Sequence, residues 1–423
     1  MLSIALRQHE LDNGLTVVLA PDPTVPVVAL NLWYGVGSRN ERPGRTGFAH
    51  LFEHLMFQGS LHVEKGRHFD LVERAGGSLN ATTWFDRTNY FETLPSHQLD
   101  LGLWLESDRM GWFLPAMTEE KLENQRDVVR NERRQRYDNQ PYGDWDERMQ
   151  ALVFPPDHPY HHTVIGSMED LALADLSDVG EFFETYYRPN NAVLTLAGDF
   201  ESADALRRIE RYFGGIPRGG AIPPIPGRTE IEPLIGTTVR ELVEAEVPLP
   251  RVHLGFRIPP VTDPRFHVAE VTCAILGWGR ASRLYRGLVR ESRIAKDVVA
   301  FPYPLSAGST LMICRATGLP ETDPEGLEHA LQQEIDALGE VSESEVGRAV
   351  ALAETAYVRE VERLATRADL LSMNRMVFGD ASRINTEMDR IRSVTAEDVR
   401  EFARTILGDR NRALLTYVPR EAS

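Results

Sequence analysis

The pattern of apolar and polar positions divides the chain into two similar halves. In the first half, the residues from Leu15 to Leu19 and from Val27 to Tyr34 predict two strands joined by a turn around Pro21. In the second half, the residues from Thr237 to Glu246 and from Arg251 to Ile258 predict two strands in the same order. The two halves therefore begin with the same kind of unit.

An amphipathic helix followed by a strand also occurs twice. The first copy comprises residues 178–185 and 192–195, and the second, about 220 residues later, comprises residues 398–405 and 413–416. We expect an α+β fold of two duplicated α/β sandwich domains, each with an antiparallel-rich sheet covered by helices. The predicted domains are 1–217 and 237–423, and the Gly- and Pro-rich region between them predicts a linker at 218–236.

The first half contains an HxxEH pattern formed by His50, Glu53 and His54. Its surroundings predict a helix, with Thr46 as a candidate N-cap and Gly59 as a candidate stop. Residues four apart share one helical face, so both imidazoles can bind one metal ion while Glu53 points beside it. This arrangement favours zinc-dependent hydrolysis. The alternative is two histidines satisfied within a core.

A catalytic zinc ion needs a third protein ligand. Residues 119–132 predict a helix with Thr118 as its N-cap, and the stripe of this helix that should be buried ends on Glu132. A buried carboxylate requires a partner, so we predict Glu132 as the third ligand. The alternative is an ion pair between Glu132 and Arg133 or Arg136.

Composition excludes several other classes of protein. A chain of 423 residues exceeds one core, and a net charge of -17 argues against nucleic acid and favours neutral or basic peptides as partners. No run is apolar enough to span a membrane and the N-terminus lacks a signal-peptide pattern, so we expect a cytoplasmic chain. Cys273 and Cys314 are expected to be buried free thiols. His158, His161 and His162 follow prolines, which favours a loop-packing or solvent-facing role over a second metal site.

The sequence around the HxxEH pattern resembles the pitrilysin family of zinc metallopeptidases, the inverzincins. The likeness is carried by HLFEH, LMFQGS, GGSLNATT, DRTNYF and QRDVVRNE, which begin at residues 50, 55, 76, 86 and 125, and it extends from Leu11 to the C-terminal strand. The chain is similar to the catalytic subunit of mitochondrial processing peptidase and its bacterial relatives. The resemblance implies a half-clamshell built from two α/β domains.

By this resemblance, one Zn²⁺ per chain binds His50, His54 and Glu132, and Glu53 is the general base. Asn80 and Ala81 match the strand edge against which family members bind an extended peptide.

Two positions depart from the family pattern. Gln125 stands where many members carry a supporting glutamate near the metal, so Gln125 can support the metal ligands through hydrogen bonding but not through charge. Arg290 matches a substrate-gripping arginine, but Lys296 occupies the place of the accompanying tyrosine, and Tyr285 is expected to pack within a helix. The incomplete gripping pair predicts a dimer, with a heterodimer with a related subunit that lacks HxxEH favoured over a homodimer.

We therefore predict a zinc metalloendopeptidase that hydrolyses extended peptides or unfolded segments, with Glu53 as general base on zinc-bound water. One alternative is a subunit that removes targeting peptides as part of an obligate pair. Another is a non-catalytic structural relative, which would be expected to have lost Glu53 or a histidine. The sequence does not distinguish the general endopeptidase from the subunit that removes targeting peptides.

Overall fold

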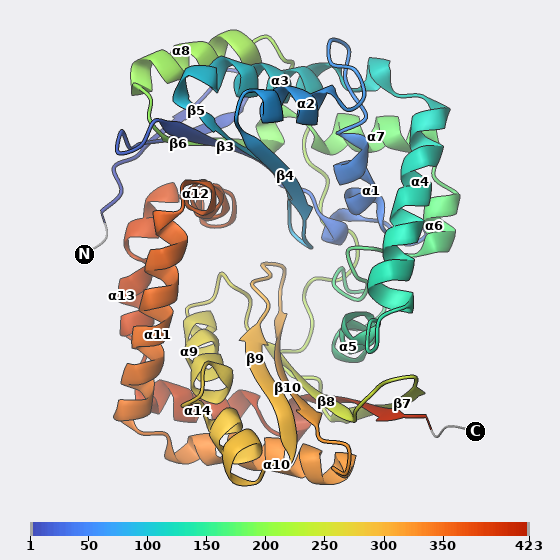
Figure 1. Cartoon of the computed structure of the whole chain (residues 1–423), viewed down its shortest axis with the longest axis vertical. Helices are drawn as coiled ribbons and strands as arrows, with labels where there is room; N and C mark the ends of the chain where they lie inside the picture. Colours follow the sequence, from blue (N-terminus) through green and yellow to red (C-terminus); the bar gives the residue numbers. More distant parts are fainter. Residues whose placement is uncertain (1–2, 421–423) are drawn as a thin grey trace. The chain divides into compact units, whose positions relative to one another are not determined.

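A computed structural model describes residues 3–420, and these residues pack into two compact units. The described residues of the first unit fall within Met1–Glu132, Thr163–Pro226 and Arg359–Thr386. Those of the second unit fall within Arg133–His162, Gly227–Val358 and Glu387–Ser423. Each unit contains one mixed β-sheet flanked by helices, as the sequence predicts (Figure 1).

The sheet of the first unit has six strands in the order β1-β2-β6-β3-β5-β4. Only the β2–β6 pair is parallel. Strand β3 matches its predicted bounds, and β4 is the last strand at one edge of the sheet. The strands are β1 (Arg7–Glu10), β2 (Thr16–Pro21), β3 (Val27–Tyr34), β4 (Ser78–Thr83), β5 (Thr88–Pro95) and β6 (Ala192–Gly198).

The sheet of the second unit repeats this topology without a counterpart of β1. Its order is β7-β11-β8-β10-β9, and among the described strands only β7 and β11 pair in parallel, as β2 and β6 do in the first sheet. The predicted duplication is therefore visible in the strand order. The strands are β7 (Thr238–Ala245), β8 (Arg251–Ile258), β9 (Ala295–Pro302), β10 (Thr310–Gly318) and β11 (Arg412–Pro419).

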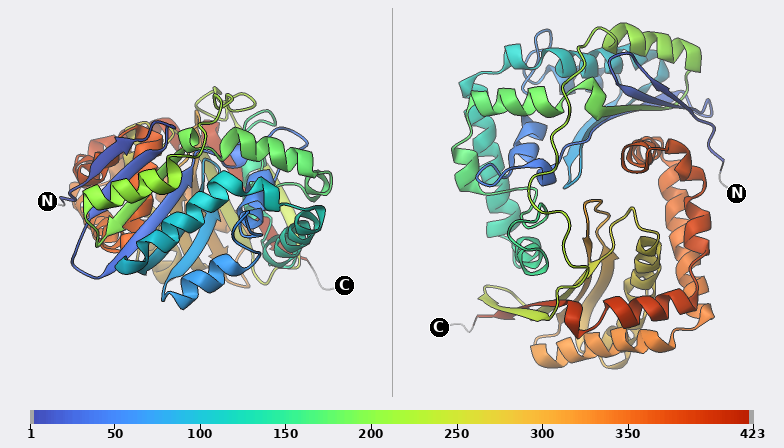
Figure 2. Two further views of the ribbon diagram at one scale, coloured as in Figure 1. Left: turned by 90° about the horizontal axis from the view of Figure 1, so that it is seen from above. Right: turned by 180° about the vertical axis from the view of Figure 1, so that it is seen from behind.

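Helices cover both faces of each sheet (Figures 1 and 2). In the first unit they are α1 (Phe48–Leu55), α2 (Arg67–Arg74), α3 (Leu99–Trp112), α4 (Glu119–Arg133, ending just past the unit's boundary), α6 (Met168–Ala172), α7 (Leu176–Tyr186), α8 (Ser202–Phe213) and α12 (Leu364–Phe378). In the second unit they are α5 (Trp145–Val153), α9 (Arg265–Gly277), α10 (Pro324–Asp336), α13 (Glu387–Arg392) and α14 (Ala396–Ile406), while α11 (Glu343–Glu362) begins there and crosses the boundary.

Two helices are exchanged between the halves of the sequence. Helix α12, from the second half, packs on β3 and β6 of the first sheet, and Figure 2 shows it from behind. Helix α5, from the first half, packs on the equivalent strands β8 and β11 of the second sheet, where Gly255 leaves room for Met149. The units therefore differ from the contiguous domains 1–217 and 237–423 expected from the sequence. The reason is that an amphipathic pattern shows that a helix buries one face, but not which sheet receives it.

The segment predicted as a linker, 218–236, contains no helix or strand, and the units divide within it at Pro226. Cys273 and Cys314 are buried free thiols, as expected. Within residues 3–420, no helix combines the length and the hydrophobicity that crossing a membrane requires. The cytoplasmic location stays a prediction from the sequence.

Candidate metal centre

Helix α1 places the HxxEH residues, and its start differs from the sequence prediction. The N-cap is Gly47, in a left-handed conformation with a φ of 85°, rather than Thr46. The carboxylate of the buried Glu41 accepts hydrogen bonds from the backbone N–H groups of Gly47 (2.9 Å) and Ala49 (2.8 Å). A distant glutamate therefore caps this helix, while the Thr46 hydroxyl donates to Asp170 at 2.7 Å. Sequence spacing cannot reveal a cap that tertiary packing supplies.

The apolar face of α1 fixes the direction of its histidines. Leu51, Phe52 and Leu55 on this helix are fully buried, which orients the opposite face. His50 and His54 lie one turn apart on that face, and their ring centroids are 4.9 Å apart. The helix ends at Leu55, before the predicted stop at Gly59.

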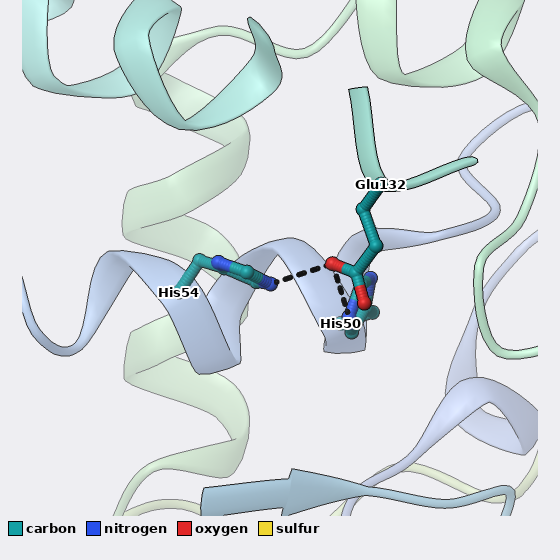
Figure 3. Close-up of side chains that lie close together, drawn as sticks. All are labelled: His50, His54 and Glu132. Atoms are coloured by element: carbon teal, nitrogen blue, oxygen red, sulfur yellow. Dashed lines mark ion pairs between the residues drawn. The ribbon is translucent and has the colours of Figure 1, made fainter. Parts of the chain in front are cut away.

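Helix α4 brings the third predicted ligand to the same place. Thr118 accepts a hydrogen bond from the Lys121 backbone at 3.3 Å, which confirms the predicted cap. Glu132 lies on the last turn of α4, and its Oε2 atom is 3.5 Å from Nε2 of His50 and 3.3 Å from Nε2 of His54 (Figure 3). Residues far apart in the sequence thus present two imidazoles and a carboxylate to one point.

The donor set and its spacing fit zinc. The ligand atoms of His50, His54 and Glu132 all lie within 4.8 Å of one another. In a tetrahedral site with zinc bonds of about 2.0–2.1 Å, neighbouring ligand atoms are about 3.3 Å apart, close to the two distances measured here. Three protein ligands leave a fourth position for water or substrate, which is the pattern of catalytic sites rather than structural ones.

Glu53 lies beside this group and points toward the end of β4. The hydroxyl of Thr83 donates a 2.6 Å hydrogen bond to Oε2 of Glu53. Burial raises the pKa of the Glu53 carboxyl, while the Thr83 hydrogen bond and the positive charges of His54 and Arg87 oppose that rise. A carboxylate with a raised pKa is a better proton acceptor than an exposed one. Thr83 and Arg87 occur in the motifs that carry the family likeness, but sequence reasoning assigned them no role.

The other predicted site residues occupy distinct places. Asn80 and Ala81 lie on β4, paired with Phe91 and Tyr90 of β5, at the edge of the first sheet. Gln125 is buried on α4, and its side-chain amide donates to Asn124 at 2.9 Å. The predicted supporting role of Gln125 stays a prediction.

The residues predicted to grip substrate belong to the second unit. Arg290 is exposed on the π-helical segment Tyr285–Glu291, and Lys296 is exposed on β9. Tyr285 is half-buried on the same segment as Arg290. The role of Arg290 in substrate binding stays a prediction.

The histidines near residue 160 pack within their loop. His158 stacks on Phe154 with ring centroids 4.6 Å apart and accepts a hydrogen bond from the Tyr160 backbone at 3.1 Å. A ring nitrogen of His161 lies 2.8 Å from the carbonyl oxygen of Phe154. These contacts agree with the loop-packing role expected for this cluster.

A second group of possible ligands is buried in the first unit, and sequence reasoning missed it. His68 on α2, Glu92 on β5 and Glu106 on α3 offer ligand atoms within 4.8 Å of one another. Glu106 is already engaged, because both its oxygens accept hydrogen bonds from the buried guanidinium of Arg109. Because Glu106 is paired with Arg109, we interpret His68, Glu92 and Glu106 as a structural cluster rather than a metal site.

Comparison with known proteins shows the family to which the chain belongs. The family model described as Insulinase (Peptidase family M16) matches residues 16–151, and the model described as Peptidase M16 inactive domain matches residues 174–352. The zinc protease PqqE of Helicobacter pylori is 33% identical over 356 residues, which cover 81% of this chain and 78% of that protein. The chain belongs to peptidase family M16. This assignment confirms the predicted resemblance, since the pitrilysin-type enzymes are its members.

Other M16 relatives cover nearly the whole chain. An uncharacterized zinc protease of Mycobacterium tuberculosis, Rv2782c, is 28% identical over 409 residues, covering 96% of this chain and 92% of that protein. A crystal structure of a protease from Helicobacter pylori has a TM-score of 0.92 at 28% identity and covers 98% of this chain and all of that one. The M16 inactive domain from Pseudomonas fluorescens, with a TM-score of 0.85 at 17% identity, shares the fold and covers 98% of each chain.

Proposed function

We propose that this M16 peptidase is a zinc-dependent endopeptidase that hydrolyses extended peptides or unfolded segments. The observation that carries the proposal is the convergence of His50, His54 and Glu132 on one point with the Glu53 carboxyl beside it. When bound there, zinc lowers the pKa of water in the site and polarises the scissile carbonyl.

The residues around that point have separate tasks. Glu53 accepts the proton of the attacking water and then donates it to the leaving amine, so one carboxyl serves both halves of the reaction. The Thr83 hydroxyl holds one oxygen of Glu53 and leaves the other for this transfer. Strand β4 ends at Thr83, and its free edge at Asn80 and Ala81 offers backbone groups to which an extended peptide can add as a further strand.

The test is digestion of a mixed peptide library by the purified chain, with and without chelator, read by mass spectrometry. Glu53→Gln provides the matched variant, because it keeps size and hydrogen bonding but accepts no proton. We expect it to retain its zinc while hydrolysis falls roughly 100-fold or more. Activity close to that of the wild type in this variant would contradict the assignment of the base.

We also propose that the chain acts as a dimer, with a heterodimer favoured. The supporting observation is that Arg290 is present in the second unit but a lysine, Lys296, replaces the tyrosine of the family pattern. A lysine cannot reproduce the rigid ring and neutral donor of a tyrosine. A related subunit that keeps both residues but lacks HxxEH would supply them, and such a pair is also the arrangement of a targeting-peptide processing enzyme.

Molecular mass and turnover, measured first for the chain alone and then with a candidate partner, test the heterodimer. Turnover should rise when the partner is added. A monodisperse homodimer that already hydrolyses peptides at the full rate would contradict it.

A further inference from the structure

Asp369 on helix α12 is joined by hydrogen bonds to the hairpin of β4 and β5, whose residue Thr83 contacts Glu53. Its Oδ1 atom accepts hydrogen bonds from Nε1 of Trp33 at 2.7 Å and from Nδ2 of Asn89 at 2.9 Å. Trp33 and Asn89 are both buried in the first sheet, on β3 and β5. A carboxylate from the second half of the sequence is therefore bound to two strands of the first sheet.

The hydrogen bonds continue from Asn89 to the end of β4. The hydroxyl of Thr82 donates to Oδ1 of Asn89 at 2.6 Å, so the amide of Asn89 donates on one side and accepts on the other. The guanidinium of Arg87 in turn donates to the carbonyl and the hydroxyl oxygens of Thr82, at 2.8 and 2.5 Å. The next residue, Thr83, donates to Glu53. The chain of contacts thus ends on the proposed general base.

Arg87 adds an electrostatic link along the same route. Burial lowers the pKa of its guanidinium, and the nearby negative charges of Asp369, Glu53 and Asp86 oppose that shift. Asp369 therefore shares with Glu53 the attraction of one buried cation. Loss of the Asp369 charge removes one of the attractions that hold the Arg87 guanidinium in place, so the guanidinium can shift toward Glu53 and Asp86.

We infer that Asp369 is a positioning residue for Glu53, acting through Asn89, Thr82 and Thr83. The inference rests on the proposed function, because it assumes that Glu53 is the general base. The contribution is to geometry, and displacements of about 1 Å in an active site can lower a rate 100-fold.

The test compares Asp369→Asn with Ser372→Ala in the purified full-length chain. Asparagine keeps the size of the side chain and one oxygen that can accept the hydrogen bonds of Trp33, Asn89 and Asn31, while it removes the charge and turns the second oxygen into an NH2 group. Ser372 is a matched control, because it lies on the same helix and donates a buried 2.8 Å hydrogen bond to Thr195 of the same sheet, away from the hairpin. We expect kcat to fall roughly tenfold in Asp369→Asn, with KM within about twofold and zinc content unchanged. In Ser372→Ala, kcat should be unchanged at a similar melting temperature.

A double-mutant cycle separates positioning from a general loss of stability. Thr83→Val breaks the final link to Glu53, so Asp369→Asn should lower kcat little further in that background. If Asp369→Asn folds poorly, Thr82→Val takes its place, because it breaks the intermediate hydrogen bond to Asn89. We expect Thr82→Val to show a similar loss of kcat. The inference is overturned if kcat is unchanged in Asp369→Asn, or if kcat falls as much in Ser372→Ala. It is also overturned if the double variant with Thr83→Val loses kcat by the product of the two single losses. If Glu53→Gln itself remains active, the proposed function fails instead.

Discussion

The hydroxyl of Thr83 donates a 2.6 Å hydrogen bond to the carboxylate of Glu53, from the last residue of β4 to the helix that carries both histidines. Thr83→Val removes this donor while keeping the shape of the side chain. We expect kcat to fall roughly tenfold, because the carboxylate loses the contact that orients it for proton transfer. Zinc content should not change. Thr83→Ser keeps the hydroxyl and is the control, which should retain most of the activity in a steady-state peptide assay.

The metal assignment is tested by removing one ligand. His54→Ala leaves only His50 and Glu132 at the site, too few protein groups for tight zinc binding. After dialysis, the variant should contain one equivalent of zinc less than the wild type, as measured by elemental analysis. The exposed His97 provides the control, and His97→Ala should keep its zinc. Unchanged zinc in His54→Ala would refute the ligand set.

Two buried glutamates near Arg109 should differ in how strongly the same substitution affects stability. Glu106→Gln leaves the fully buried guanidinium of Arg109 without its counter-charge, so the free energy of unfolding should fall by about 3–5 kcal/mol. Burial and the neighbouring Glu106 raise the pKa of the Glu92 carboxyl well above its usual range. Burial thus favours the protonated form of Glu92, and Glu92→Gln, which is uncharged and has the same shape, should lower the free energy of unfolding by about 1 kcal/mol at most.

The raised pKa of Glu92 also predicts that the free energy of unfolding depends on pH. Above the ordinary pKa of a glutamate, the unfolded chain releases the Glu92 proton while the folded chain retains it, so this residue lowers stability as pH rises. Glu92→Gln should therefore gain stability relative to the wild type as pH rises above 4.5 in denaturant titrations. A difference that does not change with pH would contradict a raised pKa of the Glu92 carboxyl.

His158 predicts a loss of stability in acid. Burial lowers the pKa of its imidazole from 6.5 to about 4. Between these values the unfolded chain binds a proton that the folded chain does not, so the free energy of unfolding should decrease as pH falls from 6.5 to 4, by on the order of 2 kcal/mol. His158→Gln removes the titrating ring, and its free energy of unfolding should fall less steeply over that range. At pH 7.5, above the ordinary pKa of histidine, the difference in the free energy of unfolding between this variant and the wild type measures only the cost of lost packing.

The local sequence was sufficient to predict the helices that carry the candidate metal ligands. Helical spacing places His50 and His54 on one face, and the stripe of the helix at 119–132 directs Glu132 inward, because both depend only on the 3.6-residue period. Strands 27–34 and 251–258 match their predicted bounds, since alternation and turn residues are local signals. The repeated order of the two sheets also follows from a repeated pattern.

Only the tertiary structure decided what surrounds those elements. Glu41 caps α1, Thr83 orients Glu53, and Asp369 supports the hairpin from α12, although none of these residues stands at a spacing that marks its role. Such contacts join segments through packing between elements, whereas sequence periods report each element alone. The exchange of α5 and α12 has the same cause, because the apolar face of a helix does not specify the sheet on which it packs.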